Sequence, residues 1–95
     1  MKYLLLAATL LVPTSSHADF EHHLLEYRTC SHDALSRVLE YADALTCMDH
    51  YLRVKLYFAG VTYDQYQSMS ARERAAVNQR GYLRFKDWES EQTGN

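Results

Sequence analysis

The chain contains few residues that interrupt helices, with only three glycines and one proline among its 95 residues. It also lacks the Asn-Gly and Asp-Gly pairs that mark tight β-hairpin turns. These absences disfavour sheet-rich folds, and apolar residues recur at helical spacing along most of the chain. We therefore predict an all-α fold: a small single domain of three to four helices after a cleaved signal peptide, with one disulfide.

An excess of basic residues is also missing. The chain has 10 Lys and Arg against 12 Asp and Glu, a formal net charge of −2, and its basic residues are scattered. Nucleic-acid binding depends on clustered positive charge, so we expect no nucleic-acid partner. Neither a Gly-rich phosphate loop nor a nucleophile elbow occurs. We predict that the protein is not an enzyme and has no catalytic residues, cofactor or metal.

Long uncharged runs are absent except at the N-terminus. Leu4–Val12 carries no charge, follows Lys2 and is ended by Pro13. A membrane-spanning helix needs about 20 apolar residues, so a run of this length fits the hydrophobic part of a signal peptide. An uncleaved N-terminal anchor is the alternative.

The residues after this run are small and polar and end in an A-x-A-like pattern at Ala18. We predict that residues 1–18 form a Sec-type signal peptide, cleaved between Ala18 and Asp19. The mature domain would comprise residues 19–95, with a frayed tail from about 90 to 95. It would be periplasmic or secreted, without stable membrane insertion after cleavage.

Both cysteines, Cys30 and Cys47, fall in the predicted mature part. In an oxidising compartment a disulfide is expected, and it would stabilise the fold by about 3 kcal/mol in the chain-entropy model. A continuous helix would separate these residues by about 25 Å, whereas a disulfide needs Cα atoms about 4.4–6.8 Å apart. We predict irregular backbone from Ser31 to about Ser36, and a disulfide-linked homodimer is the alternative.

The spacing of apolar residues and the signals for helix N-termini divide the mature chain into four expected helices. We expect helices at about 20–29, 33–59, 63–68 and 71–88. Thr62 with Gln65 and Ser70 with Glu73 match capping boxes, in which two side chains satisfy free backbone N–H groups reciprocally. We expect the last helix to continue through Gly81, because apolar residues keep their register beyond it.

Tyrosine is unusually frequent, with eight in the chain. Aromatic side chains fill the cores of small helical domains, and tyrosine is also enriched at protein interfaces. We expect the core to include Tyr27, Tyr41, Tyr51 and Phe58. We predict that the partner-binding residues are Tyr57, Tyr63, Tyr66 and Tyr82, which flank loops and polar neighbours.

One pair of residues has the spacing of a reactive site. His50 follows Cys47 by three residues, so both would share a helical face and could bind zinc or activate a thiolate. A disulfide at Cys47 would remove that ligand, and a closed zinc site normally needs four. We therefore favour a disulfide and solvent-facing helical histidines.

A small aromatic-rich domain without catalytic residues is best interpreted as a binding protein. We expect it to bind another exported or envelope protein, as an inhibitor, an immunity or exclusion factor, or an accessory subunit. Two alternatives remain: a periplasmic chaperone or acid-stress protein, and a thiol- or metal-dependent enzyme that uses Cys47 and His50.

Overall fold

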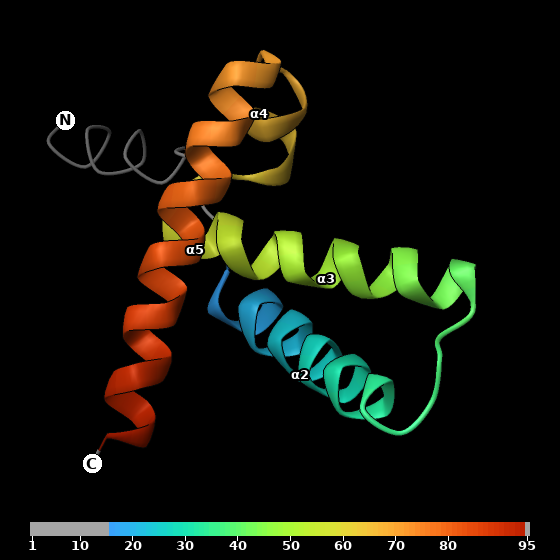
Figure 1. Ribbon diagram of the computed structural model, residues 1–95. Helices are drawn as coiled ribbons and strands as arrows, with labels where there is room; N and C mark the ends of the chain where they lie inside the picture. The colour runs from blue at the N-terminus through green and yellow to red at the C-terminus, as the bar shows by residue number, and fades with distance from the viewer. Residues whose placement is uncertain (1–15, 95) are drawn as a thin grey trace, which may run out of the picture.

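The computed structural model describes residues 16–94, which form helices joined by short connections and contain no strand. Their helices are α2 (His17–Ala34), α3 (Tyr41–Ala59), α4 (Tyr63–Gln67) and α5 (Ala71–Thr93), as Figure 1 shows. The all-α prediction is confirmed. Most of the predicted signal peptide lies outside the described residues, and its expected cleavage position falls in the first turn of α2. Within residues 16–94, no helix is long and apolar enough to cross a bilayer.

The local start and stop signals behave as expected. Both predicted capping boxes form: Gln65 N–H donates to Thr62 Oγ1 at 3.1 Å and Glu73 N–H donates to Ser70 Oγ at 3.2 Å. Gly60 ends α3 in the left-handed region, with φ of 73°, a conformation that favours glycine. Short-range chemistry therefore fixes these three boundaries.

The boundaries that depend on packing differ from the prediction. Helix α2 runs to Ala34, beyond the expected end at Thr29, and α3 begins at Tyr41 instead of Asp33. Helix α5 passes through Gly81 as predicted, but it continues to Thr93, so residues 90–93 are helical where a frayed tail was expected.

Helices α2 and α3 form an antiparallel hairpin, and α5 crosses α3 near the end of the hairpin opposite the connecting loop (Figure 1). Residues 35–40 make that loop, slightly later than the break predicted from Ser31 to Ser36. The reversal brings Cys30 and Cys47 together as an intrachain disulfide, with Cα atoms 5.8 Å apart. The expected conflict between a continuous helix and this bond is resolved by the loop.

The core lies where α2, α3 and α5 meet. One buried cluster contains Phe20, Leu24, Val54 and Phe85, and a second contains Leu56, Ala59, Val61 and Val77. The predicted core residues Tyr27, Tyr51 and Phe58 pack against the first cluster. Tyr41 does not, and its prediction is wrong: it is 80% exposed because it begins α3 at the hairpin end that α5 does not reach.

A close helix crossing holds the core together. Gly81 is buried in α5, and a Cβ atom at this position would overlap the carbonyl oxygen of Lys55 in α3. Glycine therefore allows the two backbones to approach. This contact fixes where α5 covers α3, and so it also decides which part of α3 is left uncovered.

Candidate functional site

An apolar stripe runs along α3 and is covered over only half of its length. Tyr41, Leu45, Met48, Leu52 and Leu56 recur at three- and four-residue spacing and therefore share one helical face. Leu56 is buried with Val61 and Val77, and Leu52 packs against them. Tyr41, Leu45 and Met48 are exposed. The stripe thus continues past the core into solvent.

The hairpin loop adds to this uncovered surface. Leu35 and Val38 were expected in a long second helix, but they lie in the connection at 85% and 94% exposure. We call the five residues Leu35, Val38, Tyr41, Leu45 and Met48 the distal apolar surface. All five are exposed and come from the loop end of the hairpin, between residues 35 and 48. Contiguous exposed apolar groups are typical of interaction sites, whereas scattered ones are ordinary.

Tyr57 and Tyr63, two of the four tyrosines predicted to bind a partner, lie at one hollow and make close contacts inside the domain. The Tyr57 ring stacks on Phe20 with centroids 4.2 Å apart. The Arg53 guanidinium lies 3.6 Å from the centroid of the Tyr63 ring. Both tyrosines are half-buried, and both line a hollow that also includes His23.

Of the other two predicted tyrosines, Tyr66 makes contacts inside the domain, whereas Tyr82 is more open to solvent. The Asn78 side-chain amide donates to the Tyr66 hydroxyl at 2.8 Å, and the Arg74 guanidinium lies 5.2 Å from the centre of the Tyr66 ring. Tyr82 lies on α5 at 44% exposure and is the most open of the four. The structure does not bring Tyr82 together with the tyrosines of α3 and α4 in the hollow.

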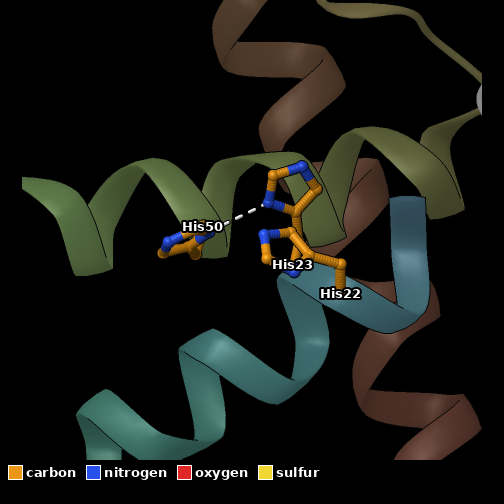
Figure 2. A group of neighbouring side chains, drawn as sticks. All are labelled: His22, His23 and His50. Atoms are coloured by element: carbon orange, nitrogen blue, oxygen red, sulfur yellow. Dashed lines mark hydrogen bonds between the residues drawn. The ribbon is translucent and has the colours of Figure 1, made fainter. Parts of the chain in front are cut away.

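A histidine cluster joins the two helices of the hairpin (Figure 2). His22 and His23 come from α2, and His50 comes from α3. Each contributes one ring nitrogen to a group in which these atoms lie within 4.8 Å of one another. The Nδ1 atoms of His23 and His50 are only 2.9 Å apart, so one must donate and the other accept.

The surroundings of His23 favour its neutral form. Burial lowers the pKa of His23 below its usual value, and the neighbouring His50 and Arg53 lower it further. The Arg53 charge is partly balanced, because its Nε lies 3.6 Å from an Asp49 carboxylate oxygen. Neutral imidazole is the form that accepts hydrogen bonds and binds metals.

The pairing of Cys47 with His50 does not form a thiol site. Cys47 is bonded to Cys30, so its sulfur is neither a thiolate ligand nor a nucleophile in this structure. His50 faces the α2 histidines instead. Sequence reasoning missed this cluster because it depends on how two antiparallel helices align. The disulfide could have indicated that alignment to within about one helical turn.

The chain shows no significant match to any protein-family model, curated protein or solved structure. Two features of the hairpin define the candidate site. The distal apolar surface can bind apolar groups of a partner, and the histidine cluster can accept or donate hydrogen bonds or bind a cation.

Proposed function

We propose that the chain is an exported, non-enzymatic protein that binds another exported or envelope protein through its distal apolar surface. The observation that carries this proposal is the half-covered stripe of α3. Its inner part packs into the core. Its outer part, from Tyr41 to Met48, has the same apolar character, but no helix among residues 16–94 covers it. A partner that covers the outer part would extend the existing packing.

The hairpin is suited to binding because its shape is already fixed. The disulfide links the two helices at the loop end of the hairpin, so little order has to be gained there when a partner docks. Charged residues at the same end, including the Asp33–Arg37 pair at 3.8 Å, supply a polar margin. Apolar centres with polar margins are typical of protein interfaces.

Export is the second part of the proposal. The N-terminal run has the length and the cleavage pattern of a signal peptide, and the Cys30–Cys47 pair suits an oxidising compartment. In that setting, roles as an inhibitor, an immunity or exclusion factor, or an accessory subunit all require a stable surface and no catalytic group.

Affinity capture from an envelope extract, followed by mass spectrometry, tests the proposal. Leu45→Glu and Met48→Glu place a charge on the distal apolar surface at positions that are already exposed. Each should leave the helical circular dichroism unchanged and weaken binding by about 2 kcal/mol, roughly 30-fold in Kd, as at interface hot spots.

Leu83→Glu is the matched control because Leu83 is an exposed leucine on α5. It should not affect capture. If capture survives both α3 substitutions, the distal apolar surface is not the contact. If Tyr82→Ala or Leu83→Glu removes capture instead, the contact lies on α5 and the original tyrosine prediction gains support. Concentration-dependent dimerisation that Met48→Glu abolishes would identify a second copy as the partner.

A further inference from the structure

We propose that His22, His23 and His50 form a binding site for a divalent transition-metal ion of the zinc type, which crosslinks α2 and α3. The metal-free expectation drawn from the sequence considered His50 only together with Cys47. The folded hairpin gives His50 two different neighbours, and all three are imidazoles.

The geometry supports a shared ion. One nitrogen from each histidine already lies within 4.8 Å of the others, and the closest pair is separated by 2.9 Å. Zinc binds histidine nitrogen at about 2.0–2.1 Å, so two nitrogens on one ion must lie within about twice that distance of each other. Any pair near the 4.8 Å limit must therefore move closer by side-chain rotation before all three nitrogens can bind one ion.

The donor set indicates the class of metal. Imidazole suits Zn²⁺, Cu²⁺ and Ni²⁺, whereas Ca²⁺ and Mg²⁺ prefer oxygen ligands. Three histidines with a free fourth position are a known zinc arrangement, in which water or another ligand completes the tetrahedron. His22 is exposed, so the fourth position can open towards solvent.

The nearby charges are compatible with a cation. Arg53 is the neighbouring positive group, but its Nε lies 3.6 Å from Asp49 and its guanidinium rests on the Tyr63 ring. The guanidinium is therefore held by contacts of its own. Asp49 precedes His50 and adds negative charge close to the cluster.

Metal binding would give the hairpin a second crosslink. The stacked pair Tyr27–Tyr51, with centroids 4.5 Å apart, lies next to the cluster, and the Cys30–Cys47 bond lies towards the loop. A metal at the histidines would hold α2 and α3 on the core side of that bond. Bound metal should therefore slow amide exchange in the first half of α2.

Isothermal titration of the purified, tag-free protein with ZnCl₂ tests the inference. We expect one zinc ion per chain and a higher Tm in its presence. His23→Gln and His50→Gln keep a polar side chain while removing a ligand. Each should lower zinc affinity by more than the roughly 10- to 100-fold loss typical of residues that only support a metal ligand.

His32→Gln is the matched control, because His32 is an exposed histidine of the same helix outside the cluster. It should bind zinc with the same affinity as the unmodified protein.

Co²⁺ provides an independent readout, since its visible absorption distinguishes four-coordinate from six-coordinate sites. Absence of zinc binding, equal binding by His50→Gln with its helical circular dichroism intact, or loss of binding in His32→Gln would each overturn the inference. None of these results depends on whether a protein partner is captured.

Discussion

The two ends of the α2–α3 hairpin are held together in different ways. At the core end, Phe20, Leu24, Val54 and Phe85 are at most 5% exposed and come from three helices. At the loop end, the distal apolar surface is 47–94% exposed, and the helices are linked by a disulfide. One end is stabilised by burial, and the other by a covalent bond.

This difference explains how a small domain can leave apolar residues in solvent. A chain of this size buries only a modest fraction of its surface on folding, so its core provides only marginal stability. The disulfide restricts the unfolded chain and fixes the loop end without requiring its apolar side chains to be buried. Those side chains remain available for a partner.

The largest expected effect comes from breaking the core end. Phe85→Ala removes a side chain that is 1% exposed and contacts the rings of Tyr27, Tyr51 and Phe58. Truncation of a buried phenylalanine costs about 3–5 kcal/mol, a large part of the roughly 5–15 kcal/mol that stabilises a typical domain. Urea unfolding followed by circular dichroism should show this loss.

Leu83→Ala provides the comparison on the same helix. Leu83 is exposed, so its truncation should change the free energy of unfolding by no more than about 0.5 kcal/mol. Equal losses from the two variants would contradict the placement of the core on this face of α5.

Sequence reasoning succeeded where local chemistry decides the structure. The capping residues Thr62 and Ser70, the end of the second helical region at residue 59 and the passage of α5 through Gly81 were all predicted. It misplaced the loop because Leu35 and Val38 have helical spacing, although both side chains are almost fully exposed in the connection. The histidine cluster was missed for a related reason: His50 meets its neighbours through an alignment of helices that periodicity does not encode.

Removal of the disulfide tests the loop end. A Cys30→Ala/Cys47→Ala double variant should lose about 3 kcal/mol of stability in the chain-entropy model. Hydrogen exchange should accelerate mainly between residues 30 and 47, because few buried contacts hold that segment. The α3–α5 crossing should keep its protection.

A uniform loss of protection in the double variant would show that the two ends unfold as one unit. The contrast between burial and covalent linkage would then describe the native structure but not its energetics. Chemical reduction of the unmodified protein should reproduce the behaviour of the double variant, since it breaks the same bond.

A smaller effect is expected from Gly81→Ala, and its sign is informative. At a solvent-exposed position inside a helix, alanine is more favourable than glycine by about 1 kcal/mol. At Gly81 the added methyl group would meet the Lys55 carbonyl oxygen, so α5 must move away from α3. Overpacking of this kind costs about 1–3 kcal/mol, and thermal unfolding should show a lower Tm.

Ala76→Gly is the control, at an exposed position of the same helix. Its stability should fall only by the difference in helix propensity between alanine and glycine. A stabilised Gly81→Ala variant would mean that the helices do not approach closely here. The α3–α5 crossing would then contribute less to the stability of the core end than its burial indicates.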